Sequence, residues 1–243
     1  MDRRIVIIPT YNEKENIEKI IRYVFQLPDE FHILVIDDGS PDGTAQIVKY
    51  LMEEFNGKLF LEERKGKLGL GTAYIHGFKW CIAHNYDFIF EMDADFSHNP
   101  NDLIKLYQTA VEQKADAVIG SRYCNGVNVV NWPMSRILMS YFGSAYVRMV
   151  LRLPIQDTTA GFICYRRTLL EQLNFDRIRH TGYGFQIEMK YIIWKLGFKI
   201  MEMPIIFVDR KEGTSKMSSG IFKEAIWGVI RLRFRSIRKY LKA

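Results

Sequence analysis

Short apolar runs alternate with helix-like segments through the first half of the chain. The apolar runs predict buried strands at residues 5–8, 32–36, 58–61, 88–92 and 117–119. The segments between them predict helices over 14–25, 43–55, 69–83 and 100–113. Strands separated by helices at this rhythm are typical of an α/β fold with a doubly wound, mostly parallel sheet.

The second half of the chain is less regular. Its pattern predicts helices over 133–151 and 185–196, a strand over 161–165, and a strand over 199–208 that Pro204 interrupts. Residues 210–216 are predicted to form a polar loop, and Ser218 or Ser219 is expected to cap a final helix. No internal repeat, low-complexity tract or linker divides the chain.

The composition is that of a globular protein, and the excess charge lies at one end. Hydrophobic residues make up 48% of the chain and charged residues 26%, which argues against a disordered chain, a collagen-like fibre or a coiled coil. The net charge is +6, and residues 221–243 hold seven Lys or Arg against one Glu. This segment therefore carries the whole excess, and we expect a polyanionic surface to be its partner.

The cysteines and the hydropathy of the chain indicate the cellular compartment in which we expect the protein. Cys81, Cys124 and Cys164 have neither zinc spacing nor the pattern of a disulfide framework, which favours a reducing compartment. No signal peptide is recognised, and the most hydrophobic stretch, between Arg136 and Arg148, has 11 uncharged residues where a membrane span needs about 20. We expect a cytoplasmic protein, or one that rests on a membrane without crossing it.

Acidic and aromatic residues follow four of the predicted strands, where doubly wound sheets bind their ligands. The four clusters are Pro9–Glu13, Asp37–Gly43, Asp93–Asp95 and Gly120–Tyr123. Asp93 and Asp95 are the sharpest signal, because two carboxylates at this spacing past a strand can turn toward one cation such as Mg²⁺ or Mn²⁺. With Glu91 and His98 nearby, a metal site is favoured over a pair of solvated turn residues.

Two further signals concern nucleotides and phosphates. A carboxylate at 37 or 38 can accept hydrogen bonds from a ribose or a base, while Asp42 is placed to cap the next helix. The glycines at 69 and 71 do not complete a dinucleotide fingerprint, because Tyr74 stands at its sixth position, and we reject a hydride cofactor. Arg122, Arg210 and Lys216 are candidate phosphate ligands.

Together these residues resemble family 2 glycosyltransferases of the GT-A fold, and more narrowly the dolichol-phosphate (polyprenol-phosphate) mannose synthases. The resemblance runs from about Arg4 to Met217. The motifs that carry it are PTYNE at 9–13, IDDGSPDGT at 36–44, KLGLGTA at 67–73, MDADFSHNP at 92–100, GSRY at 120–123, NWP at 131–133 and FVDRKEGTSKM at 207–217.

The resemblance assigns roles to individual residues. It implies that the base and ribose of a sugar nucleotide are held by Pro9, Tyr11, Glu13, Ile36 and Asp38. It implies a Mg²⁺ or Mn²⁺ ion on Asp93 and Asp95, with Ala94 lining the site. It implies that phosphates are gripped by Arg122, Arg210 and Lys216, that the acceptor phosphate is approached by Arg136, and that the residues most directly involved in catalysis are Asp95 and Arg122.

Two positions stand apart from this assignment. Some relatives have Gln where this chain has Ser97, and the shorter side chain argues against Ser97 as a direct metal ligand. Residues 157–162 match a D-x-T-x-G-F pattern loosely, and the sequence assigns them no role.

The implied reaction is an inverting transfer of mannose from GDP-mannose to a polyprenyl (dolichyl) phosphate, which gives polyprenyl phosphate β-mannose and GDP. A phosphate monoester is already anionic at pH 7 and needs no general base, which fits a site rich in cations without an evident catalytic His. On this interpretation residues 1–217 are a GT-A catalytic domain, and residues 218–243 are a basic amphipathic helix at a membrane interface.

The final helix carries the membrane hypothesis. Its apolar positions are Phe222, Ile226, Val229, Ile230, Ile237 and Leu241, with basic residues between them. Such a helix can lie on an anionic membrane surface, here the cytoplasmic face, or pack on the body with its charges in solvent. Residues 133–151 are a second candidate contact, and core packing is the other interpretation there. The sequence leaves a membrane partner protein open.

Three alternatives remain. The same fold can use UDP-glucose or another donor, or an envelope glycan as acceptor. A nucleotide-binding module without turnover is disfavoured by the acidic pair and the candidate phosphate ligands. A nucleic-acid partner is not expected, because the body of the chain is neutral and has no recognition motif.

Overall fold

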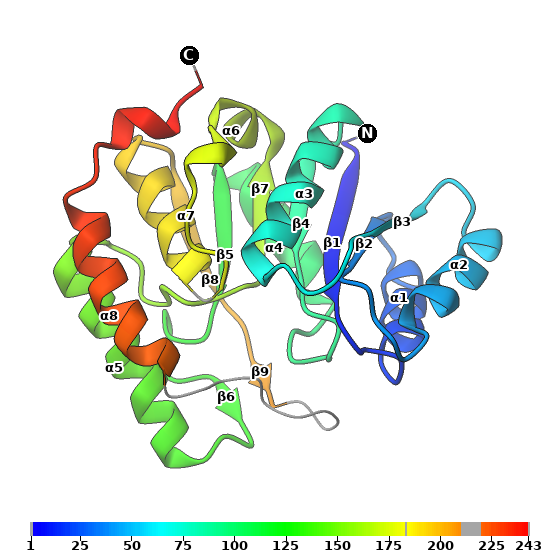
Figure 1. The fold of residues 1–243 in the computed structure, drawn as a ribbon, viewed down its shortest axis with the longest axis horizontal. Helices are drawn as coiled ribbons and strands as arrows, with labels where there is room; N and C mark the ends of the chain where they lie inside the picture. The colour runs from blue at the N-terminus through cyan, green and yellow to red at the C-terminus, as the bar shows by residue number, and fades with distance from the viewer. Residues whose placement is uncertain (1, 183, 210–219, 243) are drawn as a thin grey trace.

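The structure is a computed structural model that describes residues 2–182, 184–209 and 220–242, with residues 220–226 described by their backbone alone. At its centre is a seven-stranded sheet in the order β3-β2-β1-β4-β7-β5-β8 (Figure 1). The strands are β1 (Arg4–Thr10), β2 (His32–Asp37), β3 (Leu59–Glu63), β4 (Phe88–Glu91), β5 (Ala117–Ser121), β7 (Ile163–Arg166) and β8 (Ile200–Pro204).

The sheet is parallel except at one strand. β7 runs antiparallel to both of its neighbours, β4 and β5. The pairs β1–β2, β1–β4, β2–β3 and β5–β8 are parallel. The predicted mostly parallel α/β sheet is therefore confirmed, and β7 brings its first residues, rather than its last, to the edge where the parallel strands end.

Helices cover both faces of the sheet. They are α1 (Ile17–Phe25), α2 (Thr44–Glu54), α3 (Leu70–Ala83), α4 (Asp102–Glu112), α5 (Met134–Leu151), α6 (Arg167–Gln172), α7 (Gly184–Lys195) and α8 (Gly220–Arg233), with short 3₁₀ helices at Phe175–Arg177 and Ile237–Tyr240. Each predicted helix of the first half is present, with ends that differ by up to three residues.

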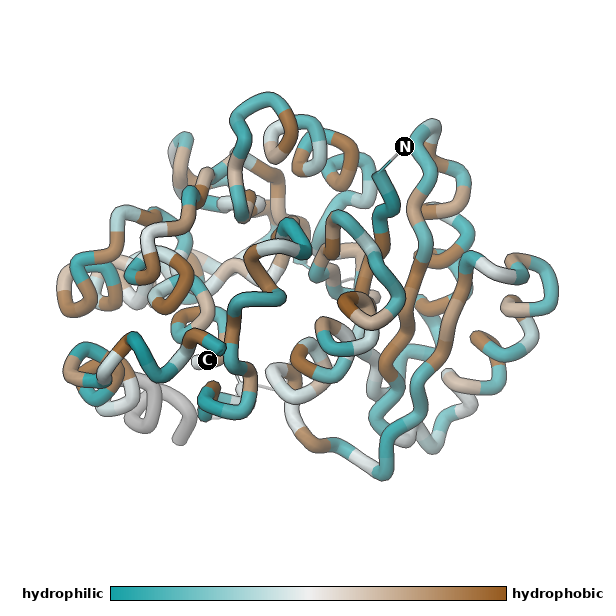
Figure 2. Tube along the Cα trace, turned by 90° about the horizontal axis from the view of Figure 1, so that it is seen from above, coloured by the Kyte–Doolittle hydropathy of each residue, from teal (hydrophilic) through white to brown (hydrophobic). Residues whose placement is uncertain are grey.

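The alternation of side chains along the strands creates two cores. Ile5 and Ile7 of β1 face the core that includes residues of α3 and α7, while Val6 and Ile8 face the core that includes residues of α1 and α4. Figure 2 shows the central strands as hydrophobic segments between more polar helices. Burial on both faces explains why these strands appear in the sequence as uninterrupted apolar runs.

A small second sheet lies beyond the edge where the parallel strands end. Its two parallel strands are β6 (Val129–Val130) and β9 (Phe207–Val208). β9 is also held to the loop after β4, because the Val208 amide donates to the carbonyl of Ser97 at 3.3 Å. The single strand predicted over 199–208 is therefore two strands in the structure, β8 in the central sheet and β9 in this small one.

The C-terminal segment is not one continuous helix, in contrast to the prediction for 218–243. α8 packs beside α5 and α7, and ends at Arg233 (Figure 1). Beyond it, the Asn174 amide donates to the Tyr240 carbonyl at 2.7 Å and the Lys242 amide to the Gln172 carbonyl at 2.9 Å. These contacts draw the chain back onto the body, so that Ile237 and Leu241 do not continue the stripe that begins in α8.

Candidate active site

Four predicted clusters meet at one edge of the sheet. β2, β1 and β4 are neighbours, so Asp38, Tyr11 and Asp93 follow adjacent parallel strands. Arg122 follows β5, on the other side of β7. Because β7 is antiparallel, the segment before it, residues 157–162, comes to the same edge. The fold thus gathers residues that lie far apart in sequence.

A cavity of about 520 Å³ opens at this edge. Its charged lining residues are Asp93, Asp95, Arg122 and Arg136, and most of the remaining lining is apolar. The apolar lining comes largely from α5 and adjoining elements, and includes Leu70, Leu138, Met139, Phe142, Val147, Ile187, Ile205, Phe207 and Val229. The cavity therefore combines a few charged side chains with a largely apolar lining.

The acidic pair, Asp93 and Asp95, lines the cavity. The Asp93 side chain is 42% exposed, and Asp95 is half-buried with its Oδ1 accepting the Ser97 amide at 3.0 Å. Ala94 between them is buried. No group of three His, Cys, Asp or Glu is arranged for a metal within the described part of the chain. The pair fits a divalent ion that completes its coordination with water or substrate oxygens.

Glu91 and His98, which the sequence places near this pair, are internal residues. Burial raises the pKa of Glu91 to about 8, and its Oε2 accepts Gln186 Nε2 at 2.6 Å. Burial lowers the pKa of His98 to about 4, and its ring stacks on Phe162 with centroids 4.8 Å apart. His98 is therefore neutral at pH 7. Glu91 is enclosed in the core, whereas His98 is buried but borders the cavity.

The predicted nucleotide residues lie beside the cavity, at the ends of β1 and β2. Pro9, Tyr11 and Glu13 are half-buried, and Lys67 lies over the Tyr11 ring with Nζ 5.2 Å from its centroid. The Ile36 side chain is fully buried in the core. The side chains at the end of β1 are thus more accessible to a ligand than Ile36 is.

Asp38 is held by an arginine that the sequence analysis did not single out. Arg64 Nε donates to Asp38 Oδ1 at 2.6 Å, and Arg64 Nη1 donates to Thr72 Oγ1 at 2.9 Å. Arg64 therefore links the ends of β2 and β3 to the start of α3. The adjacent Asp37 is internal, because Thr10 Oγ1 and the Ser40 amide both donate to it at 2.8 Å.

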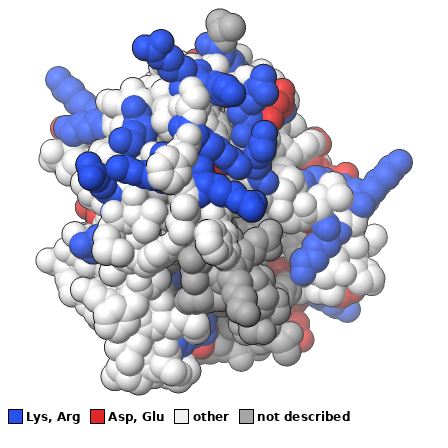
Figure 3. All heavy atoms as spheres, turned by 60° about the vertical axis from the view of Figure 1, so that its left-hand side comes forward, with Lys and Arg blue, Asp and Glu red and all other residues white. Residues whose placement is uncertain are grey.

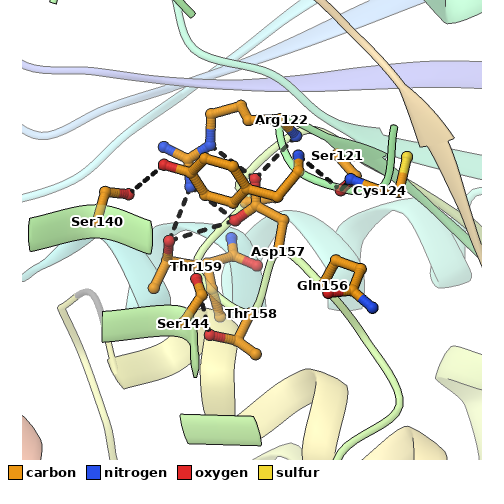
Figure 4. A network of polar contacts seen from close by, with 12 residues as sticks. Ser121, Arg122, Cys124, Ser140, Ser144, Gln156, Asp157, Thr158 and Thr159 are labelled. Atoms are coloured by element: carbon orange, nitrogen blue, oxygen red, sulfur yellow. Dashed lines mark hydrogen bonds and ion pairs between the residues drawn. The ribbon is translucent and has the colours of Figure 1, made fainter. Parts of the chain in front are cut away.

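Arg122 is bound by Asp157, which the sequence assigned no role (Figure 4). Nε donates to Asp157 Oδ2 and Nη2 to Oδ1, both at 2.7 Å, and Nη2 also donates to Thr159 Oγ1 at 2.8 Å. Burial alone would lower the pKa of Arg122, but Asp157 raises it, and the pair stays charged. Arg122 thus borders the cavity with most of its guanidinium already engaged.

Arg136, at the first turn of α5, is more open. Its Nη1 donates to both carboxylate oxygens of Asp209, at 2.9 and 3.0 Å. Its guanidinium carbon lies 4.1 Å from the centroid of the Trp132 ring. Arg210 and Lys216, the other two predicted phosphate ligands, lie outside the described residues.

A buried polar cluster supports the cavity from α7. Lys190 Nζ donates to the Ala160 carbonyl at 2.6 Å, next to Gly161, which borders the cavity. Burial lowers the pKa of Lys190 to about 8. Sequence analysis singled out neither Lys190 nor Arg64 and gave Asp157 no role. It searched the residues that follow strands, whereas Lys190 lies in a helix and Asp157 precedes an antiparallel strand. Arg64 does follow a parallel strand, β3, but no acidic or aromatic cluster marked that position.

Comparisons with known proteins agree with this architecture. A family model described as glycosyl transferase family 2 matches residues 5–173. The chain is 42% identical over 232 residues to a polyprenol monophosphomannose synthase of Mycolicibacterium smegmatis, covering 93% of this chain and 87% of that protein. It is 43% identical over 229 residues to an undecaprenyl-phosphate mannosyltransferase of Micrococcus luteus, covering 94% and 93%.

Solved structures share the fold. Glucosyl-3-phosphoglycerate synthase from Mycobacterium tuberculosis, in complex with Mn²⁺, UDP and glucosyl-3-phosphoglycerate, superposes with a TM-score of 0.63 at 20% identity, covering 95% of this chain and 78% of that one. A mannosyltransferase from Pyrobaculum calidifontis, in complex with GDP-Man and Mn²⁺, gives 0.55 at 18% identity, covering 96% and 70%.

The fold and the acidic edge define a glycosyltransferase of the GT-A type. The chain belongs to glycosyl transferase family 2. Among its described helices, none is both long and apolar enough to cross a membrane.

Proposed function

We propose that this enzyme transfers mannose from GDP-mannose to a polyprenyl phosphate and releases GDP. The observation that carries the proposal is the cavity, whose lining combines the charged Asp93, Asp95 and Arg136 with mostly apolar side chains. A polyprenyl phosphate has the same combination, since a phosphate head is joined to an isoprenoid chain. The names of the two relatives, a polyprenol monophosphomannose synthase and an undecaprenyl-phosphate mannosyltransferase, support this acceptor and this sugar.

The donor would lie across the ends of β1, β2 and β4. Tyr11 and Glu13 would border the nucleoside, and Asp38 would accept a hydrogen bond from it with the carboxylate held by Arg64. The diphosphate would then lie near Asp93 and Asp95. Arg210 and Lys216 keep their predicted role as phosphate ligands in this proposal.

A divalent ion, Mg²⁺ or Mn²⁺, would be held by Asp93 and Asp95, and when bound it would offset the charge of the departing diphosphate. The Mn²⁺ complexes of the two structural neighbours support an ion of this class. The protein residues align the two substrates and balance their charges.

The chemistry needs no side chain to remove a proton. A phosphate monoester has a second pKa near 6, taking phosphorylated side chains as the guide, and is largely dianionic at pH 7. One of its oxygens would form a bond to the anomeric carbon of mannose while the bond from that carbon to the diphosphate breaks. Direct displacement inverts the α-linked donor to a β-linked product. The buried, neutral His98 is in keeping with this scheme.

The same proposal locates the enzyme on the cytoplasmic face of a membrane, without crossing it. Exposed apolar side chains from α5 and α8 include Met134, Phe142, Met149 and Trp227, and the exposed Phe234 follows α8. Figure 3 shows Lys and Arg gathered over the upper part of the face that carries the C-terminal segment, with mostly uncharged described residues at the lower left. An apolar surface beside a basic one suits the interface of an anionic bilayer.

A transfer assay tests the function. Purified protein is incubated with radiolabelled GDP-mannose, Mg²⁺ and a short polyprenyl phosphate, and label in the organic phase is counted. Label should enter that phase only when the phosphorylated lipid is present, and the matched polyprenol is the control. Unlabelled UDP-glucose should compete poorly. Strong competition by UDP-glucose, or no labelled lipid, would contradict the proposal.

A further inference from the structure

Two side chains from different segments hold the guanidinium of Arg136. Asp209 contacts one edge of it, through Nη1 at 2.9 and 3.0 Å. The Trp132 indole contacts it at 4.1 Å, the distance from the guanidinium carbon to the ring centroid. A carboxylate and an aromatic ring on the same arginine restrict both its position and the orientation of its plane.

The small β6–β9 sheet brings these two contacts together. Trp132 follows β6, and Asp209 follows β9 directly. Val130 pairs with Val208, and the Asp209 amide donates to the Val130 carbonyl at 3.0 Å. Since β9 is also bonded to Ser97, the arrangement around Arg136 is tied to the loop that carries the acidic pair.

Arg136 retains hydrogen-bond donors for an anion, whereas Arg122 has committed most of its own. Arg122 donates through Nε and Nη2 to Asp157, and its side chain is only 10% exposed. Neither Nε nor Nη2 of Arg136 makes a hydrogen bond to the residues that the structure describes, and its side chain is 28% exposed at the cavity.

The Trp132 ring that contacts Arg136 also carries a buried N–H group. Its Nε1 is buried and has no hydrogen-bond partner in the described part of the chain. Trp132 borders the cavity together with Arg136. The Nε and Nη2 donors of Arg136 therefore suit an oxyanion in the cavity.

We propose that Asp209 and Trp132 are positioning residues that orient Arg136 toward the phosphate of the acceptor. The inference rests on the proposed function, because it takes a phosphate monoester with an apolar tail as the ligand. A long, flexible arginine that is already oriented loses less side-chain freedom on binding than one that is free in solvent. The two residues act through Arg136, and the inference gives them no direct part in bond making.

A merely structural ion pair would behave differently. Arg136 and Asp209 are both partly exposed, at 28% and 25% of their side-chain area, and such pairs contribute little to the stability of a fold. If the pair were only structural, breaking it would change the stability of the fold or have no effect. If the pair positions Arg136, breaking it raises the KM for the acceptor and leaves donor binding unchanged.

The first experiment compares Asp209→Asn with Asp176→Asn. Asp176 is a matched control, because it also pairs with one cation, Lys79, at 2.9 Å, and is 81% exposed. With saturating GDP-mannose, we expect the KM for a short polyprenyl phosphate to rise about tenfold in Asp209→Asn, the size typical of a misplaced charged contact. The Kd for GDP-mannose and the melting temperature should stay close to wild type. In the control, Asp176→Asn, the acceptor KM, the Kd for GDP-mannose and the melting temperature should all stay close to wild type.

Equilibrium binding supplies a readout without turnover. Wild type should bind the polyprenyl phosphate more tightly than the matching polyprenol, and Asp209→Asn should lose most of that difference. Trp132→Leu should lose it as well, while Trp132→Phe, which keeps an aromatic face, should retain part of it. If Asp209→Asn fails to fold, the comparison of Trp132→Leu with Trp132→Phe tests the inference in its place.

A charge swap separates positioning from pairing. Arg136→Asp combined with Asp209→Arg keeps an ion pair but moves the guanidinium, so the melting temperature should stay near wild type while the acceptor KM stays high. Recovery of the KM by the swap would overturn the inference, as would an unchanged acceptor KM in Asp209→Asn or an equal loss of donor affinity. If wild type itself fails to glycosylate the lipid, the proposed function fails instead.

Discussion

Arg122 and Asp157 form a buried ion pair with two parallel hydrogen bonds of 2.7 Å. The Asp157 carboxylate has no exposed side-chain area, and it also accepts the Arg122 amide at 3.0 Å. The pair joins the end of β5 to the segment before β7, the neighbouring strand that breaks the parallel order of the sheet. It holds Arg122 at the border of the cavity.

Removing the carboxylate should be costly to the fold. Asp157→Ala leaves a buried guanidinium without its counter-charge, and we expect the free energy of unfolding to fall by about 3–5 kcal/mol. Urea denaturation measures it. The control is Glu171→Ala, which breaks the more exposed pair with Arg167 and should cost about 0.5 kcal/mol or less. Equal losses in the two variants would refute a buried, energetically important pair.

The acidic pair should be needed for transfer and not for folding. Asp95→Ala and Asp93→Ala are each expected to lower kcat by about 100-fold or more, the scale of a lost electrostatic contact to a leaving group. Circular dichroism and melting temperature should stay near wild type, since both side chains are partly exposed. A chelator should abolish wild-type transfer, and added Mg²⁺ or Mn²⁺ should restore it. Near-normal activity in Asp95→Ala would remove the metal assignment.

Stability should fall in acid through Glu188, a fully buried carboxylate. Burial alone would raise its pKa, but hydrogen bonds from the His180 ring and amide and from Tyr240 lower it from 4.5 to about 2. A depressed pKa contributes stability above the unfolded value of 4.5, and this contribution, about 3 kcal/mol at most, is lost as the pH falls toward 2.

Denaturant unfolding at a series of pH values checks this. Glu188→Gln should be less stable than wild type at pH 7, and the gap between the two should narrow between pH 5 and pH 2. Glu171→Gln should run parallel to wild type. A gap for Glu188→Gln that is independent of pH would show that the carboxylate is not titrating in this window.

Membrane binding should depend on exposed Arg and Lys residues of the C-terminal segment. The structure favours testing this by substitution of these residues and not by truncation of the chain. Deleting everything after Ser219 would also remove the buried Val229, Leu232 and Tyr240 from the core. A triple substitution to Glu at the exposed Arg231, Arg238 and Lys239 leaves those contacts in place. It should abolish flotation with anionic liposomes, and high salt should weaken flotation of wild type.

The matched control substitutes Glu at three exposed lysines of the opposite part of the chain, Lys14, Lys19 and Lys49. This variant should float like wild type. Equal loss of flotation in the two triple variants would mean that net charge, and not the C-terminal surface, drives binding.

The sequence was sufficient to predict most of the strands and helices and the acidic edge of the site. The run Ile5–Ile8 identifies a strand buried on both faces, and Asp93 with Asp95 directly after another such strand identifies the acidic edge. The final helix shows the limit of periodicity. Its apolar spacing continues past Arg233, yet Tyr240 and Lys242 bond to the segment around residues 172–174, and the helix ends.

The sequence by itself determined the order of strands and helices, the parallel character of most of the sheet and the acidic edge, because these follow from local periodicity and from residues directly after strands. The tertiary structure alone decided which charges are paired. Asp38 with Arg64, Arg122 with Asp157 and Arg136 with Asp209 join residues 26, 35 and 73 positions apart. Each pair forms because the fold brings two distant segments together, and local sequence patterns carry no information about such distant partners.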